Sequence, residues 1–228
     1  MIKDPENWRE IGRRVSTGEI ATAICASIRE SGIRNLSLSG GIDSTLLLFF
    51  MKKVLGDPIR CFTITVDENH PDYIHAKLAA EFFDVSFHPY LIHKKLEPDD
   101  IVRAFYGRLI EQGIEEIIAG DGIDEFACGY YSHEKDRSEE NYISWIRRLN
   151  PEHLVPLDKN SGDVSVYLPY LSPGVIELLS LVPLSEKVDS CRRKRVIVEM
   201  AQGNIPEEIV NRWKYGFCDA SNDKGAVA

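Results

Sequence analysis

Hydrophobic positions in the first half of the chain alternate between a helical period and short continuous runs. Ser16-Thr17-Gly18-Glu19 has the spacing of a capping box, and Ile20, Ile24 and Ile28 then recur at helical intervals up to Gly32. A glycine just past the last apolar position is a common helix stop. The pattern predicts one amphipathic helix that begins after Ser16 and ends before Gly32.

Short apolar runs and longer helical stretches then follow one another in regular alternation. We expect strands at residues 34–38, 59–66, 85–91 and 114–119, with helices between them at 43–55, 71–83 and 99–112. Strands that alternate with helices of this length are typical of a parallel sheet covered on both faces. We predict an α/β fold, a doubly wound parallel sheet of about five strands, with ligands bound beyond the carboxyl ends of the strands.

The pattern changes after Tyr131. Residues 132–140 are polar and charged, and the strand signal gives way to helical segments near 142–149, 175–181, 192–202 and 206–213. We expect a single domain over residues 1–228. In it, residues 1–131 form an α/β nucleotide-binding core and residues 132–228 form a mainly helical C-terminal part.

Composition and charge narrow the class of protein. The chain has 228 residues, of which 43% are hydrophobic and 28% are charged, as in an ordinary globular domain. Its 27 basic and 36 acidic residues give a formal net charge of −9. Because binding to nucleic acid requires a basic surface that neutralises phosphates, this balance makes nucleic acid an unlikely partner.

Two further features bear on location and on redox chemistry. The longest apolar run, Leu46–Met51, is far shorter than the ~20 residues of a membrane helix, and residues 1–10 are too polar for a secretory signal. We therefore expect a cytoplasmic protein that does not bind a membrane. The five cysteines are scattered and include no Cys-x-x-Cys pair, which disfavours both a disulfide framework and a zinc ribbon.

The strongest chemical signal is the turn Ser39-Gly40-Gly41-Ile42-Asp43-Ser44-Thr45, between a predicted strand and a predicted helix. Backbone N–H groups at a helix N-terminus, beside glycines without side chains, form a cradle for phosphate. The Asp43 carboxylate would repel that phosphate unless Mg²⁺ lies between the two groups. The alternative is a tight turn in which Asp43 only caps the helix. No Gly-x-x-x-x-Gly-Lys-Ser/Thr motif is present, which disfavours a Walker-type ATPase.

A second cluster of acidic residues follows the fourth predicted strand, in the segment Gly120-Asp121-Gly122-Ile123-Asp124-Glu125. Three carboxylates in so short a segment repel one another unless a cation is bound nearby. Because this strand ends at the same edge of the sheet as the first, we predict that Asp43 and Asp124 are ligands of Mg²⁺. Asp121 and Glu125 are candidates for positioning a substrate or an attacking amine. A solvated acidic turn is the alternative.

These two segments resemble the signature motifs of a known superfamily. Residues 39–45 are similar to the Ser-Gly-Gly-x-Asp-Ser pyrophosphate loop of the N-type ATP pyrophosphatases, also called the PP-loop superfamily. Residues 120–130 are similar to the Gly-Glu/Asp-Gly-x-Asp-Glu-x-x-x-Gly-Tyr segment of asparagine synthetases. Further matches follow in the family's order at 69–72, 79–82, 167–171, 206–209 and 212–217. The resemblance implies a synthetase domain of the asparagine synthetase type, with an adenine nucleotide alpha-hydrolase-like fold.

The resemblance also implies an activity, which is that of an ATP- and Mg²⁺-dependent carbon–nitrogen ligase that releases AMP and pyrophosphate. A carboxylate would be activated as an acyl-adenylate and then attacked by ammonia or an amine. By this resemblance the ATP and pyrophosphate contacts fall on Leu38, Ser39, Gly40, Gly41, Asp43, Ser44, Thr45, Ile64 and Gly120. Lys194 and Lys214 would stabilise the negative charge of the transition state. The alternative is that both lysines belong to solvated basic surface.

The sequence departs from the family pattern in two places. Only about forty residues precede Ser39, so we expect no glutaminase domain; the nitrogen would come from free ammonia, another amine or a separate glutaminase subunit. Where the family carries Glu, Arg and Asp around Pro169, this chain has Ser165, Tyr167 and Ser172, which leaves the carboxylate substrate open.

Other functions and states also remain open at this stage. The chain could be another PP-loop ATP pyrophosphatase, either tRNA-modifying or similar to NAD synthetase. It could equally be a non-catalytic, ATP-binding regulatory module. A homo-oligomer is compatible with the sequence.

Overall fold

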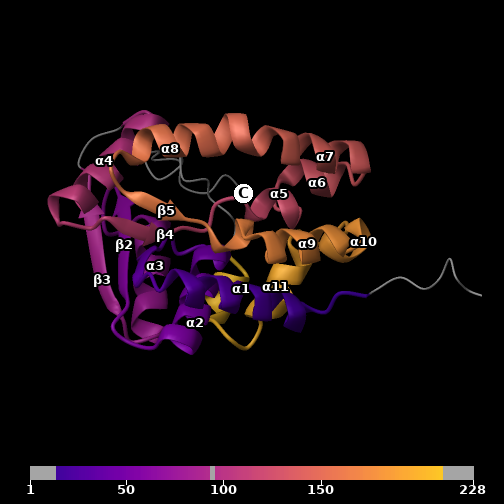
Figure 1. The fold of residues 1–228 in the computed structure, drawn as a ribbon, viewed down its shortest axis with the longest axis horizontal. Coiled ribbons are helices and arrows are strands. Elements are labelled where there is room, and N and C mark those ends of the chain that lie inside the picture. Colours follow the sequence, from indigo (N-terminus) through magenta and orange to yellow (C-terminus); the bar gives the residue numbers. More distant parts are fainter. Residues whose placement is uncertain (1–13, 93–95, 213–228) are drawn as a thin grey trace, which may run out of the picture.

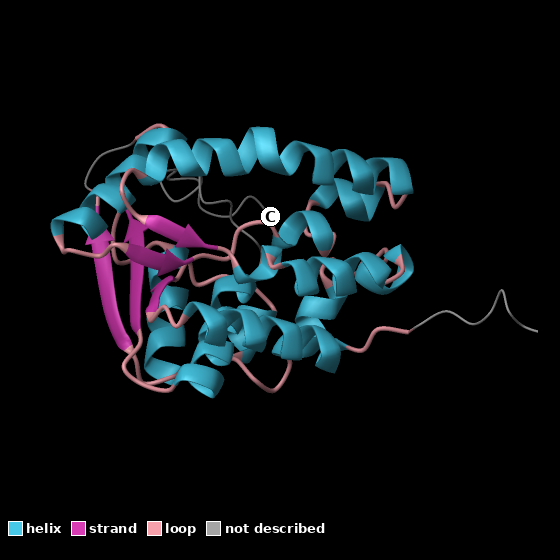
Figure 2. Cartoon of the chain, viewed as in Figure 1, coloured by secondary structure: helices cyan, strands magenta, loops and turns pink. Residues whose placement is uncertain are grey.

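The computed structural model describes residues 14–92 and 96–212, and its centre is a parallel five-stranded sheet (Figures 1 and 2). The strands are β1 (Asn35–Ser37), β2 (Arg60–Thr65), β3 (Ser86–Leu91), β4 (Glu116–Ile118) and β5 (Ser165–Tyr167), in the order β3-β2-β1-β4-β5. Because the order reverses between β1 and β4, the turns after these two strands flank the crevice where open α/β sheets bind ligands. The predicted α/β fold with a parallel sheet is confirmed.

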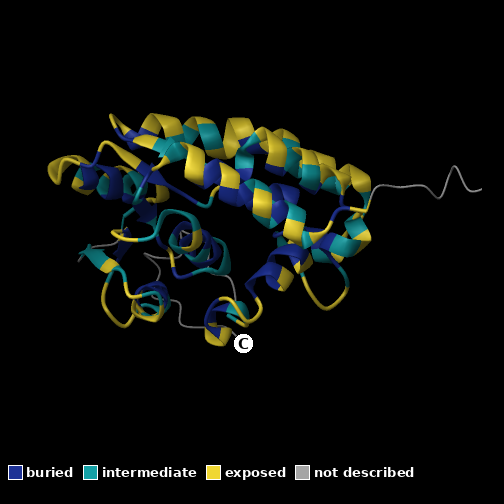
Figure 3. Ribbon diagram, turned by 60° about the horizontal axis from the view of Figure 1, so that its bottom comes forward, coloured by how far each residue is buried: buried dark blue, intermediate teal, exposed yellow. Residues whose placement is uncertain are grey.

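Helices cover both faces of the sheet. On one face the apolar side chains of α1 (Thr17–Ser31), α2 (Ile42–Leu55) and α3 (Pro71–Phe82) form the larger hydrophobic core. On the other face α4 (Pro98–Glu111) packs on β2 and β4, and α8 (Val155–Ser161) lies beside it (Figure 1). The buried residues of the long helices lie on their inward faces, as Figure 3 shows. The two-sided cover is what the alternation of strands and helices predicts.

Local signals place α1 as predicted. The Ser16 side chain accepts from the Glu19 N–H, and the Glu19 side chain accepts in turn from the Ser16 N–H, which forms a complete capping box. At the other end Gly32 adopts the left-handed conformation, with φ of 65°, and its N–H donates to the Ile28 carbonyl. The helix therefore begins and ends where its sequence indicates.

The C-terminal part is mainly helical but also completes the sheet. Its helices are α5 (Ile123–Phe126), α6 (Tyr131–Lys135), α7 (Glu139–Arg148), α9 (Pro173–Leu181), α10 (Leu184–Lys187), α11 (Arg195–Ala201) and α12 (Glu207–Val210), besides α8. A π-helical turn, Leu149–Leu154, joins α7 to α8, and a 3₁₀ turn, Pro169–Leu171, precedes α9. The sequence pattern predicted the helices α7, α9, α11 and α12. It missed α8, and it missed β5, which at three residues is too short to show alternation.

In residues 14–92 and 96–212, no helix has both the length and the apolar composition that a membrane span requires.

Candidate active site

The turn after β1 presents a set of backbone N–H groups. Gly41 is the N-cap of α2 and makes no side-chain cap hydrogen bond, so the first N–H groups of this helix are not satisfied by a capping side chain. The Ser44 hydroxyl closes the turn, because it accepts from the Ser39 N–H at 3.2 Å and lies 3.0 Å from the Ser39 hydroxyl. This geometry suits an anion at the start of α2.

The turn after β4 lies directly against the start of α2. A Cβ atom placed on Gly120 would be 3.7 Å from the Cβ of Asp43 and 3.7 Å from the backbone nitrogen of Ser44. The two glycine-rich turns therefore meet at one edge of the sheet, as their positions after neighbouring strands predicted.

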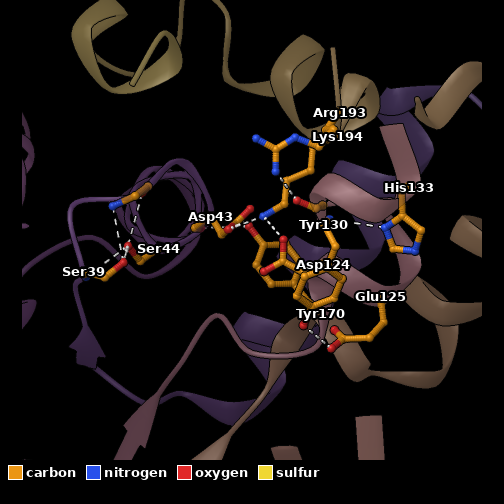
Figure 4. A network of polar contacts seen from close by, with 12 residues as sticks. Ser39, Asp43, Ser44, Asp124, Glu125, Tyr130, His133, Tyr170, Arg193 and Lys194 are labelled. Carbon is orange, nitrogen blue, oxygen red and sulfur yellow. Dashed lines mark hydrogen bonds and ion pairs between the residues drawn. The ribbon is translucent and has the colours of Figure 1, made fainter. Parts of the chain in front are cut away.

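Lys194 joins the acidic residues of the two turns. Its Nζ atom lies 2.5 Å from Oδ2 of Asp43 and 2.7 Å from Oδ1 of Asp124 (Figure 4). The Lys194 side chain is 7% exposed, and each carboxylate is 18% exposed. We call these three residues the carboxylate–lysine triad.

Burial alone would lower the pKa of Lys194, but the carboxylates of Asp124 and Asp43 outweigh this effect and raise the pKa above its usual value. The ammonium group therefore stays charged at neutral pH. Lys194 is also the N-cap of α11 and adopts a left-handed backbone conformation, with φ of 52°. Such a conformation is strained for a residue with a Cβ and is concentrated at functional sites.

Gly129 has no side chain, which leaves room for the side chains of the triad. A Cβ atom at this position would overlap Oδ1 of Asp124 and Cε of Lys194. The Gly129 carbonyl accepts from Nη1 of Arg193 at 2.6 Å, so the residue next to Lys194 holds this backbone in place. Arg193 also lies over the Tyr131 ring, with its Cζ atom 3.7 Å from the ring centroid.

Tyr170 holds the backbone of Asp43, one of the triad residues. It is fully buried on the 3₁₀ turn, and its hydroxyl donates to the backbone carbonyl of Asp43 at 2.9 Å. Burial and the nearby Asp43 carboxylate raise the pKa of Tyr170, so the phenol remains a hydrogen-bond donor. The first turn of α2 is therefore fixed to the segment that follows β5.

Glu125 lies apart from the triad and has its own partners. It is 2% exposed, and its Oε1 accepts from the Tyr130 hydroxyl at 2.7 Å, with Nε2 of His153 at 3.9 Å. Its other oxygen, Oε2, is buried and has no hydrogen-bond partner among the described residues. Burial and the hydrogen bond to Glu125 raise the pKa of Tyr130, whose ring stacks on Trp145 with centroids 3.8 Å apart. Glu125 thus has one oxygen free to accept from a ligand.

The other residues predicted for the site differ in how far they are exposed. Asp121 is exposed at the turn that precedes α5. Thr45 and Leu38 are fully buried and Ile64 is 4% exposed, so these side chains belong to the core, and contact with a nucleotide at these positions would come from the backbone. Lys214 lies outside the described residues.

A cavity of about 380 Å³ opens beside the triad. Asp43, Gly129 and Lys194 line it on one side, and α11 and α12 line it on the other with Val198, Ile209 and Val210. In the part of the chain that the structure describes, no three His, Cys, Asp or Glu side chains are grouped to hold a metal ion on their own. The triad offers two carboxylates, and Oδ1 of Asp43 is buried without a hydrogen-bond partner among the described residues. Two carboxylates are what Mg²⁺ uses when phosphates and waters supply its other ligands.

Sequence reasoning missed Tyr130, Tyr170 and Arg193 as parts of this site. Tyr130 ends the second acidic motif, so its place beside Glu125 could have been inferred from the spacing. Nothing in the sequence indicated that Tyr170 would hold the backbone of Asp43, because the two residues are 127 positions apart.

Comparisons with known proteins agree with the predicted resemblance. A family model described as asparagine synthase matches residues 35–106. A protein of Acanthamoeba polyphaga mimivirus, described as a probable glutamine-hydrolysing asparagine synthetase, is 28% identical over an alignment of 221 residues, which covers 82% of this chain. This chain spans 40% of the length of that relative. The resemblance to the synthetase part of asparagine synthetases is therefore confirmed.

Among solved structures, an ammonia-dependent NAD synthetase from Campylobacter jejuni, in complex with nitrate, matches with a TM-score of 0.42 and 16% identity. The match covers 76% of this chain and 95% of that chain.

Proposed function

We propose that this chain is an ATP-dependent ligase of the asparagine synthetase type that forms an amide and releases AMP and pyrophosphate. The observation that carries the proposal is the carboxylate–lysine triad, which lies beside the uncapped start of α2 at the point where the strand order reverses. The family resemblance supports the same reaction class.

The residues of the site suit Mg²⁺ and ATP as the bound groups. Asp43 and Asp124 would hold the metal, and Oδ1 of Asp43 has no competing partner among the described residues. Bound there, Mg²⁺ would neutralise charge on the phosphates. The N–H groups at the start of α2 and the Ser39 hydroxyl would hold the pyrophosphate end of ATP.

Lys194 would stabilise the charge that develops as the substrate carboxylate attacks the α-phosphorus and the bond to pyrophosphate breaks. Its position between two carboxylates keeps it protonated for that role. The resulting acyl-adenylate would then react at its acyl carbon with a nitrogen nucleophile, and AMP would leave. Glu125, with one free buried oxygen, would orient that nucleophile or accept its proton.

The two substrates are proposed only by class. The acceptor is a small carboxylate, and the nitrogen comes from ammonia or an amine. One of the residues that replaces a charged group of the family is used in packing, because the Tyr167 hydroxyl lies 2.9 Å from the Ser27 hydroxyl of α1. The mimivirus relative is described as glutamine-hydrolysing, and we propose that a glutaminase domain or subunit supplies ammonia to this chain.

The test is an incubation of the pure protein with Mg²⁺-ATP, ammonium and a panel of carboxylates that begins with aspartate, followed by chromatography of the nucleotides. We expect AMP and pyrophosphate with one carboxylate, and a Lys194→Met variant should abolish both products. Formation of ADP would refute the mechanism. Tight binding of Mg²⁺-ATP without cleavage, in the presence and absence of a glutaminase, would support a regulatory module instead.

A further inference from the structure

The side chain of Arg212 crosses from the end of α12 to the glycine-rich turn after β1. Its Nη1 donates to the backbone carbonyl of Gly40 at 2.9 Å, and its Nη2 pairs with the carboxylate of Asp72 at the start of α3. The Arg212 and Asp72 side chains are 7% and 10% exposed. An arginine fork is suited to two acceptors at once, and the buried carboxylate balances its charge.

Gly40, whose carbonyl Arg212 contacts, is the residue of the turn with the tightest backbone packing. It has a φ of 70°, and a Cβ atom there would lie 2.5 Å from the backbone nitrogen of Ala76 and 2.9 Å from the Asp72 carbonyl oxygen. Only glycine fits this position. The peptide between Gly40 and Gly41 also has no Cβ on either side, so little steric hindrance opposes its rotation.

The orientation of this peptide decides what the turn offers to a phosphate. In a planar trans peptide the carbonyl and the following N–H point in opposite directions. Because Arg212 holds the Gly40 oxygen on the side of α3, the Gly41 N–H points into the turn, where it donates to the Ser39 hydroxyl at 3.3 Å. A rotated peptide would instead direct the Gly40 oxygen into the turn, and its partial negative charge would repel a phosphate.

We infer that Arg212, held by Asp72, is a positioning residue that keeps the Gly40–Gly41 peptide turned so that its N–H serves the bound phosphate. The inference rests on the proposed use of this turn as a pyrophosphate cradle. Arg212 acts through the backbone, because its own charge is already balanced by Asp72. Nucleotide affinity therefore depends on a residue that is 172 positions from the turn it orients.

The test is the affinity for inorganic pyrophosphate in the presence of Mg²⁺, measured by calorimetry on the whole chain. Loss of a hydrogen bond to a charged group predicts that Arg212→Gln weakens pyrophosphate binding by about tenfold or more. The KM for ATP should rise by a similar factor, with a smaller change in kcat. Asp72→Asn should act in the same direction, and Arg212→Lys should recover part of the loss, since a lysine can hold one of the two acceptors.

Arg34 provides a matched control at the other end of α2. Its Nη1 donates to the Gly56 carbonyl at 2.8 Å and its Nη2 to the Leu55 carbonyl at 3.0 Å, so it also holds backbone carbonyls. Arg34→Gln should leave pyrophosphate affinity unchanged even where the melting temperature falls. An equal loss of affinity in this control would show that general destabilisation explains the effect, and would overturn the inference.

The remaining outcomes separate this inference from the proposed function. A folded Arg212→Gln variant with wild-type pyrophosphate affinity would overturn the inference and leave the proposed function standing. A wild-type chain that binds pyrophosphate but forms no AMP with any carboxylate would refute the proposed function, while the comparison of variants would still decide the role of Arg212. A wild-type chain that binds no pyrophosphate would refute both. Where Arg212→Gln does not fold, Arg212→Lys and Asp72→Asn carry the test.

Discussion

Replacing Lys187 with methionine should stabilise the fold. Lys187, at the end of α10, is 1% exposed, and its Nζ donates to the Tyr142 hydroxyl at 2.7 Å. The carboxylates of the triad pair with Lys194 instead, and burial lowers the pKa of Lys187 from 10.5 to about 8. The fold thus carries a buried ammonium whose main partner is a neutral phenol.

The size of the effect follows from the pKa. At 1.36 kcal/mol for each pH unit, this lowering corresponds to roughly 3 kcal/mol of destabilisation by the charged amine. Methionine has a similar length and no charge, and loss of the hydrogen bond to Tyr142 returns about 1 kcal/mol. We expect Lys187→Met to raise the free energy of unfolding by about 1–3 kcal/mol, which for a chain of this size corresponds to a melting temperature higher by roughly 3–10 °C.

The pH dependence gives a second readout. Below about pH 8 the amine is protonated in both the folded and the unfolded chain, so the penalty is fully present. Between pH 8 and 10.5 the folded chain releases the proton while the unfolded chain keeps it, so the wild type gains stability relative to the variant. Urea unfolding at pH 7 and at pH 10 should therefore show a large advantage of Lys187→Met that shrinks with rising pH.

Lys159 supplies the control, because it is exposed on α8. Lys159→Met should change the free energy of unfolding by no more than about 0.5 kcal/mol at either pH. The reasoning is refuted where Lys187→Met is no more stable than the wild type at pH 7, or where its advantage persists unchanged at pH 10.

Three further predictions concern the triad and its support. Gly129→Ala should lower AMP formation by at least about 100-fold, because the added methyl group overlaps Asp124 and Lys194; a wild-type rate in the nucleotide assay would contradict this. Lys194→Met leaves two mostly buried carboxylates without their cation and should cost about 3 kcal/mol in urea unfolding at pH 7, so an unchanged midpoint would speak against the triad. Tyr170→Phe removes one hydrogen bond to the backbone of Asp43 and should cost about 1 kcal/mol, seen as a melting temperature lower by roughly 2–4 °C; a change below 1 °C would argue that this bond contributes nothing.

Much of the fold could be predicted from local sequence signals. The capping box at Ser16 and the stop at Gly32 mark α1, and the apolar runs mark β1 to β4, because these features act within a few residues. The short strand β5 was missed because its pairing with β4 is a tertiary effect. The π-helical turn Leu149–Leu154 and α8 were also missed, because the sequence pattern predicted no helix between residue 149 and residue 175.

The candidate site was predictable in part. Asp43 and Asp124 follow neighbouring strands, so their proximity follows from the parallel sheet. The contact of Lys194 with both carboxylates could not be inferred from spacing, because the position of α11 depends on how the C-terminal helices pack on the sheet. The hydrogen bond from Arg212 to the Gly40 carbonyl could not be predicted for the same reason. Long-range side-chain contacts depend on the packing of helices whose order in space has no local signature.

The order of the triad along the chain has a consequence for biosynthesis. Asp43 precedes Lys194 by 151 positions, and Asp124 also comes before it. During synthesis both acidic residues are therefore present before the lysine that neutralises them. The carboxylates in the turns after β1 and β4 therefore lack their lysine partner until α11 has been synthesised and has packed against them. If the proposed function holds, nucleotide binding should consequently appear only after the C-terminal helices have been synthesised.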